Sequence, residues 1–169
     1  MKRLTTCITL ALLALASLPA VAGGDPARNG ALATASNRII GLWDNTAQVG
    51  PCGGTPTQPI RQTLMFIPGG GFVDNAPYPP QGAAGPGGLN QRSIGLGTWS
   101  YNPLTAQYTL DQRFDWFVNN VYNGYQVVHR TVLLSNSGNT ASGPVRTTRY
   151  ATNGSVVFEL CGSAVSTRL

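Results

Sequence analysis

The chain has 169 residues, with 11 Lys and Arg against 6 Asp and Glu, and a formal net charge of +5. The basic residues are scattered along the chain, which argues against a nucleic-acid surface built from a basic patch. One histidine and widely spaced cysteines do not match the ligand spacing of a zinc site. We therefore expect neither a nucleic-acid partner nor a bound metal.

Residues 1–22 predict a secretory signal peptide. Lys2 and Arg3 precede a mostly apolar run over residues 4–18, and residues 20–22 form an Ala-x-Ala cleavage site. The run is shorter than the roughly 20 apolar residues that a transmembrane helix needs. We expect a periplasmic or secreted protein without a membrane span. After cleavage, nine arginines face six acidic residues, and residues 23–37 are a flexible, small and polar lead-in.

Residues 38–169 predict a single all-β domain. Short runs rich in β-branched and aromatic residues alternate with turn residues, and no stretch has helical periodicity. Asn153-Gly154 is a strong hairpin signal. Eight strands are expected, at residues 38–48, 61–67, 72–75, 93–101, 107–118, 125–134, 140–150 and 155–167. Such a series favours a closed antiparallel up-and-down barrel, which leaves no unprotected edge; a two-sheet β-sandwich is the alternative.

Residues 77–91 contain four prolines and four glycines and are expected to form no regular element. A loop of this length in a compact domain is often a binding lid or a contact surface, and is otherwise disordered. It is the candidate site for a protein partner.

Cys52 and Cys161 remain after removal of the signal peptide, which carries Cys7. An even pair in an oxidising compartment predicts a disulfide. It would join the loop after the first strand to the last strand, two elements that are neighbours if the barrel closes.

Gly41-Leu42-Trp43 lies near the start of the domain, and Arg168 is the last residue but one. The guanidinium of Arg168 can stack on the indole of Trp43 and close one end of the barrel. We name Gly41, Trp43 and Arg168 the structural lock.

The Gly-x-Trp motif, the eight runs and the terminal arginine resemble the lipocalin and wider calycin group. The chain lacks the second lipocalin motif, Thr-Asp-Tyr. The run Gly95-Leu96-Gly97-Thr98-Trp99 and the late Cys161 also resemble exported bacterial proteins that look like relatives of the allene oxide cyclase and dirigent barrels. Both resemblances imply an eight-stranded barrel, and they imply different functions.

The strand at residues 107–118 gives the candidate ligand site. With a period of two, Asp111, Arg113 and Asp115 face solvent, and an aromatic set faces the lumen. The lumen-facing candidates for ligand binding are Tyr108, Gln112, Phe114 and Trp116, joined by Trp99. Gln112 is expected to bond to a neighbouring hydroxyl, because a buried amide needs a partner.

His129 is the one histidine and the best general base by its ordinary pKa. We include it among the ligand-binding candidates, although the pattern of its strand leaves its direction open. Glu159 is expected to be exposed or paired with Arg146 or Arg149. The sequence contains no nucleophile motif or phosphate loop, so no cofactor is expected and no catalytic residue is assigned.

Three hypotheses remain open. The preferred one is an exported barrel that binds a small apolar ligand in an aromatic lumen, with a cavity of a few hundred cubic ångströms open toward residues 77–91. The second is a cofactor-independent isomerase or cyclase of the allene oxide cyclase type, which needs Gln112 or His129 inside the lumen. The third is a secreted interaction or inhibitor module that uses residues 77–91.

Overall fold

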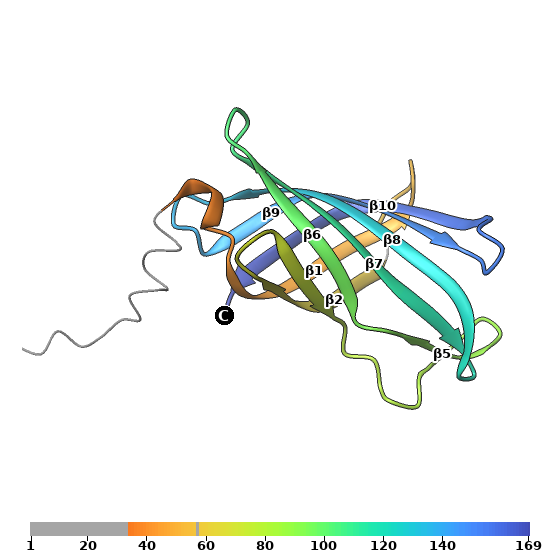
Figure 1. Ribbon diagram of the computed structural model, residues 1–169. Helices are drawn as coiled ribbons and strands as arrows, with labels where there is room; N and C mark the ends of the chain where they lie inside the picture. Colours follow the sequence, from red (N-terminus) through yellow and green to blue (C-terminus); the bar gives the residue numbers. More distant parts are fainter. Residues whose placement is uncertain (1–33, 57) are drawn as a thin grey trace, which may run out of the picture.

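The protein is an all-β closed barrel (Figure 1). The structure, a computed structural model, describes residues 34–56 and 58–169, so the expected signal peptide and residues 23–33 of the lead-in lie outside the described residues. A short 3₁₀ helix, η1 (Ala35–Asn37), precedes the strands. The strands are β1 Gly41–Pro51, β2 Gln58–Phe66, β3 Gly71–Asn75, β4 Ala83–Gly85, β5 Gly88–Arg92, β6 Gly95–Asn102, β7 Gln107–Val118, β8 Val121–Leu134, β9 Thr140–Tyr150 and β10 Val156–Arg168.

Eight strands form the ring, as the sequence predicted. The order runs β7-β6-β3-β2-β1-β10-β9-β8, all neighbours are antiparallel, and pairing between β7 and β8 closes the circle. Every predicted run contains a strand, with some ends shifted. The largest shift is at β8, which starts at Val121 because Asn119 and Asn120 both have positive φ and make a tight two-residue turn.

The expectation that residues 77–91 form no regular element is wrong. β4 and β5 make a hairpin. Residues Asn90–Arg92 of β5 pair with the end of β7, beyond the residues of β7 that pair with β6. Gly87 and Gly88 have φ of 82° and 136°, which permits the tight turn between the two strands. Asn119 on the β7–β8 turn accepts a hydrogen bond from the Leu89 amide at 2.9 Å, so the hairpin is anchored to the barrel.

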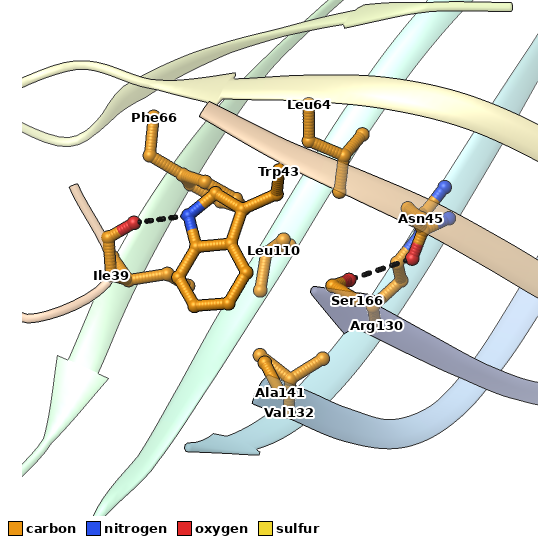
Figure 2. Close-up of a pocket in the computed structure, with 10 residues that line it drawn as sticks. All are labelled: Ile39, Trp43, Asn45, Leu64, Phe66, Leu110, Arg130, Val132, Ala141 and Ser166. Atoms are coloured by element: carbon orange, nitrogen blue, oxygen red, sulfur yellow. Dashed lines mark hydrogen bonds between the residues drawn. The ribbon is translucent and has the colours of Figure 1, made fainter. Parts of the chain in front are cut away.

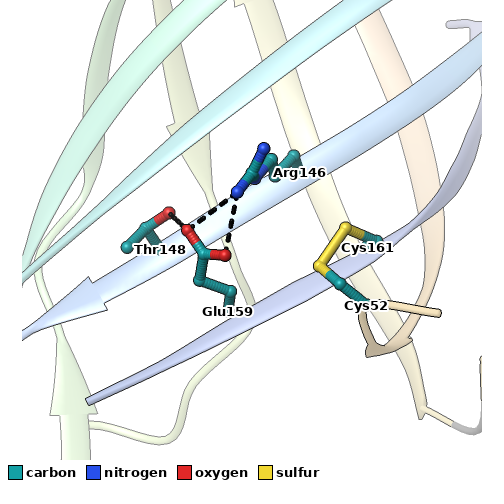
Figure 3. Close-up of a disulfide and its surroundings, with 5 residues drawn as sticks. All are labelled: Cys52, Arg146, Thr148, Glu159 and Cys161. Atoms are coloured by element: carbon teal, nitrogen blue, oxygen red, sulfur yellow. Dashed lines mark hydrogen bonds and ion pairs between the residues drawn. A yellow bond between two sulfur atoms is a disulfide. The ribbon is translucent and has the colours of Figure 1, made fainter. Parts of the chain in front are cut away.

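The disulfide between Cys52 and Cys161 is present, as predicted (Figure 3). Cys52 directly follows β1, and Cys161 lies within β10, where its backbone pairs with Gly50. The bridge therefore reinforces the junction between the first and last strands of the ring.

The lumen is filled in layers by the inward-facing residues of successive strands. The alternation predicted for β7 is observed: Tyr108, Leu110, Gln112 and Phe114 are buried, and Asp111 and Arg113 are exposed. One apolar layer, at the end that carries η1, contains Ile39, Trp43, Leu64, Phe66, Phe72, Tyr108, Leu110, Val132 and Ala141. A second, toward the β4–β5 end, contains Ala47, Val49, Phe114, Val128, Val145 and Ala164.

A layer of buried polar side chains separates the two apolar layers. On β8, Arg130 lies between Val128 and Val132, and β1, β2 and β7 repeat this order of apolar, polar and apolar with Asn45, Gln62 and Gln112. We call it the polar layer, and its members are Asn45, Gln62, Asp74, Gln112, Arg130 and Ser166. Figure 2 shows Asn45, Ser166 and Arg130 beside the first apolar layer.

Candidate functional site

The polar layer is one connected hydrogen-bond network across the lumen. Ser166 Oγ donates to Asn45 Oδ1 at 2.8 Å, and Asn45 Nδ2 donates to Gln62 Oε1 at 2.9 Å. Gln62 Nε2 donates to Asp74 Oδ2 at 2.9 Å, and Arg130 Nη2 donates to Gln62 Oε1 at 2.7 Å. The network links the first three strands, β1, β2 and β3, to β8 and β10, which lie far from them in sequence.

Asp74 is the centre of this network and is completely buried. Its Oδ2 accepts hydrogen bonds from Gln62 Nε2, from Gln112 Nε2 at 2.5 Å and from Arg92 Nη2 at 3.0 Å. Gln112 therefore bonds to a carboxylate, and the expectation of a hydroxyl partner is wrong. Asp74 was not singled out in the sequence because its strand, β3, spans only Gly71–Asn75.

A cavity of about 60 Å³ lies next to the polar layer, at the β4–β5 end of the barrel. Gln62, Arg92, Arg130, Gln126 and Thr147 contribute polar groups to its wall. The remaining lining residues are apolar or aromatic: Ala47, Val49, Ile60, Tyr78, Phe114, Trp116, Val128 and Val145. The expected volume of a few hundred cubic ångströms is wrong, since side chains fill most of the lumen. The space corresponds to a few water molecules at about 10–15 Å³ each.

The aromatic wall of the cavity is held in a fixed arrangement. Trp116 Nε1 donates to Gln126 Oε1 at 2.8 Å, and Gln126 Nε2 donates to Thr147 Oγ1 at 2.5 Å. The rings of Phe114 and Trp116 lie edge to face at 5.8 Å. A register shift between β7 and β8 next to Trp116 turns this part of the strand, as β-bulges beside sites commonly do. Tyr78, from the segment before β4, also contacts Trp116, with 5.8 Å between ring centroids and an angle of 84° between the ring planes.

The predicted ligand-binding residues fall into three groups. Phe114 and Trp116 line the larger cavity, and Gln112 lies in the polar layer beside it. Tyr108 and Trp99 pack at the opposite end, where Trp99 Nε1 donates to the Gly71 carbonyl at 3.0 Å. His129 lies on the outer face, where Nδ1 is 2.7 Å from Asp111 Oδ1, and about half of its side chain is exposed.

Tyr108 is tied to the start of the fold rather than to a cavity. Its hydroxyl donates to the carbonyl of Ala35 in η1. Burial, with a smaller contribution from Tyr101, raises the pKa of Tyr108 to about 12. A ligand in the larger cavity would be separated from Tyr108 by the polar layer.

The contact expected within the structural lock is present. Arg168 Cζ lies 4.2 Å from the centroid of the Trp43 ring, and Arg168 Nη1 donates to the Ile40 carbonyl at 2.7 Å. Gly41 has φ of 129°, and a Cβ at this position would lie 2.8 Å from Arg168 Nη1. Glycine is therefore needed for both the backbone conformation and the close approach of the arginine. These residues close the end of the barrel opposite the β4–β5 hairpin.

Glu159 lies on the outside of the barrel, paired with Arg146 (Figure 3). Arg146 Nη2 donates to Glu159 Oε2 at 2.8 Å, and Thr148 Oγ1 donates to Oε1 at 3.2 Å. The hydrogen bond from Arg146, followed by that from Thr148, lowers the pKa of Glu159. The group is solvent-exposed and far from the lumen, so we assign it no part in the site.

Sequence reasoning missed the charged members of the site, Asp74, Arg92 and Arg130. The signal was present for Arg130, because it alternates with Val128 and Val132 on the inward face of β8. Arg92 was hidden in β5, where no strand was expected. Within the part of the chain that the structure describes, no three His, Cys, Asp or Glu side chains are grouped like metal ligands.

The fold and the site define a small closed β-barrel with a partly polar lumen and one small cavity near its hairpin end. Comparison of the chain with protein-family models, with curated proteins and with solved structures finds no match. Among the described residues, no helix is long and apolar enough to cross a membrane.

Proposed function

We propose that the protein is an exported barrel that binds a small, largely apolar molecule in the cavity beside the polar layer. The observation that carries this proposal is the cavity itself, with Phe114, Trp116 and Tyr78 on its wall. Preformed apolar cavities with a few polar groups are the usual sites of small ligands. The volume of about 60 Å³ fits a short chain or part of a ring, because a cavity that holds benzene measures about 150 Å³; a whole ring enters only when Tyr78 is displaced.

Tyr78 marks the entry to this cavity. Its ring is exposed on one side and contacts Trp116 on the other. A ligand enters by displacing Tyr78, and the segment before β4 then acts as a lid. In this proposal the segment covers the cavity of its own barrel. The alternative, a protein partner that binds at residues 77–91, is less well supported.

The disulfide supports the proposed export, because such bonds persist in oxidising compartments. The charged start, apolar run and Ala-x-Ala site of residues 1–22 carry the proposal further, toward a periplasmic or secreted protein. A distant relationship to the lipocalin-like barrels is supported by the ring of eight strands and by the Trp43–Arg168 contact.

A cofactor-independent cyclase is less well supported than binding. Gln112 does lie in the lumen, but its amide nitrogen is bonded to Asp74. His129 points away from the lumen and is paired with Asp111. His129, the candidate general base, is therefore remote from any molecule in the cavity.

The test is a thermal-shift and native mass spectrometry screen of the mature protein against small ring compounds and short-chain alcohols. At least one compound should raise the melting temperature and appear as a 1:1 complex. Trp116→Ala should weaken that complex about tenfold or more, because the ring forms part of the wall. Trp99→Ala is the matched control, since Trp99 packs in the opposite half of the barrel. No stabilisation by any compound, or equal losses in both variants, would contradict the proposal.

A further inference from the structure

The larger cavity has more positive than negative charge around it. Arg92 and Arg130 both line it. Asp74 pairs with Arg92 at 3.0 Å, and the Arg92 guanidinium also lies 3.7 Å above the Phe114 ring. Among the described residues, Arg130 has no carboxylate within ion-pair distance, although Asp74 is near enough to favour its charged form. The centre of the barrel therefore holds two cations and one anion.

Arg130 is also incompletely hydrogen-bonded. It is only 3% exposed, and Nη2 donates to Gln62 Oε1 at 2.7 Å. Nε and Nη1 are buried and donate to no acceptor among the described residues. Burial lowers the pKa of Arg130, and the charge of Arg92 adds to this effect, while Asp74 opposes it. A buried guanidinium without acceptors is costly, and an anion that supplies them removes much of that cost.

The position of Arg130 decides what kind of acceptor fits. It lies between the larger cavity and a second one of about 10 Å³ and lines both. The smaller space is at the lower limit for one water molecule, whereas the larger one holds a few waters and accepts a ring once Tyr78 is displaced. Around the larger cavity, the walls beyond the arginines are mostly aliphatic and aromatic.

Building on the proposed ligand-binding function, we propose that the ligand is a small organic acid with an apolar body, whose carboxylate accepts hydrogen bonds from Arg130. The apolar body then contacts Phe114, Trp116 and the valines of the wall. Arg92 adds a second positive charge nearby, and Asp74 holds Arg92 in place. A carboxylate suits this site because guanidinium N–H groups donate strongly to it, and because it neutralises the excess buried charge.

The experiment compares benzoate with benzyl alcohol and benzamide, which have the same ring and no charge. Isothermal titration calorimetry on the mature protein at pH 7 should give an affinity for benzoate about 10- to 100-fold higher than for the neutral pair. In Arg130→Met the ratio of the affinities for benzoate and benzyl alcohol should fall to about one, whatever the change in the two affinities themselves. Arg130→Lys keeps the charge and should retain part of the preference. Arg113→Met, at an exposed arginine on the outer face of β7, is the matched control and should behave as wild type.

The outcomes separate this inference from the function beneath it. Equal affinity of the wild type for benzoate and its neutral analogues would overturn the acid preference and leave the ligand-binding function standing. It would also indicate that water satisfies Arg130. If neither these three compounds nor any other small ring compound binds, both the acid preference and the ligand-binding function are overturned. The wild-type comparison alone decides between these results if Arg130→Met does not fold.

Discussion

The guanidinium of Arg168 lies over the indole of Trp43, with 4.2 Å between Cζ and the ring centroid, and so joins the last strand to the first. The same arginine donates to the carbonyls of Ile40 and Gly138, at 2.7 and 3.1 Å. One side chain therefore connects the start of β1, the end of β10 and the turn between β8 and β9.

Removing either partner of this contact should destabilise the barrel. We expect Trp43→Ala to lower the free energy of unfolding by about 3–5 kcal/mol, the usual cost for a fully buried aromatic ring. Arg168→Ala should cost about 2–4 kcal/mol through lost hydrogen bonds and the cation–π contact. Urea denaturation followed by tryptophan fluorescence and circular dichroism measures both. Arg61→Ala, on the outer face of β2, should stay within about 0.5 kcal/mol. If Trp43→Ala and Arg168→Ala also changed the free energy of unfolding by less than about 0.5 kcal/mol, the two residues would have no role in closing the barrel.

The disulfide should contribute strongly to stability, because it closes a long loop. The two cysteines are 109 residues apart, for which the chain-entropy relation gives about 4–5 kcal/mol. The double variant Cys52→Ala/Cys161→Ala should unfold at correspondingly lower urea concentration. Adding a reductant should bring the wild type to the same midpoint and leave the double variant unchanged. A midpoint in the double variant equal to that of the oxidised wild type would contradict this expectation.

Asp74 should be the most sensitive polar position of the lumen. Asp74→Asn leaves the charge of Arg92 without its partner and raises the number of uncompensated buried cations. Breaking a buried pair in this way costs about 3–5 kcal/mol. Asp111→Asn is the matched control, because Asp111 pairs with His129 on the exposed face and should matter by less than about 1 kcal/mol. Equal effects of the two substitutions in chemical denaturation would show that the polar layer is not a stabilising network.

Alkaline pH should destabilise the protein partly through Tyr108. Its pKa is about 12 in the folded protein and 10.0 for an ordinary tyrosine, so the unfolded chain releases the proton first. The stabilisation is complete below pH 10 and is lost as the pH rises from about 10 to 12, at about 1.4 kcal/mol per pH unit. Tyr108→Phe should lose about 1 kcal/mol at pH 8, for the hydrogen bond to Ala35, and show a shallower decline above pH 10. Parallel declines in the two proteins, measured by urea midpoints at pH 8 to 11, would argue against this assignment.

The ring of strands could be predicted because local patterns specify it. Residues 108–114 of β7 alternate between buried and more exposed positions, and the inward and outward faces follow directly from a period of two. The disulfide followed from counting cysteines in a chain that was expected to be exported. The β4–β5 hairpin could not be predicted in the same way, because its residues have low strand propensity. It forms because β7 extends past β6 and offers a free edge to Asn90–Arg92.

The site was only half predictable, for a different reason. Aromatic residues such as Phe114 and Trp116 mark a lumen wall from sequence alone. The arginines do not, since Arg92 and Arg130 resemble surface residues until their strands are placed in the ring. Their place in the site depends on hydrogen bonds to Asp74 and Gln62, which strand pairing in the ring brings beside them.

The polar layer also specifies how the strands line up when the barrel closes. If β8 slipped by two residues against β7 and β9, Arg130 would enter an apolar layer, and Val128 or Val132 would replace it beside Gln62. A slip of one residue would bring His129 or Thr131 inside and place Arg130 in solvent. Each of these register slips separates the charge of Arg130 from its hydrogen-bond partners. The free-energy cost is far larger than that of exchanging one aliphatic side chain for another. Arg130, Gln62 and Asp74 thus specify the register of the strands, which a lumen filled only with valines and leucines would specify less strictly.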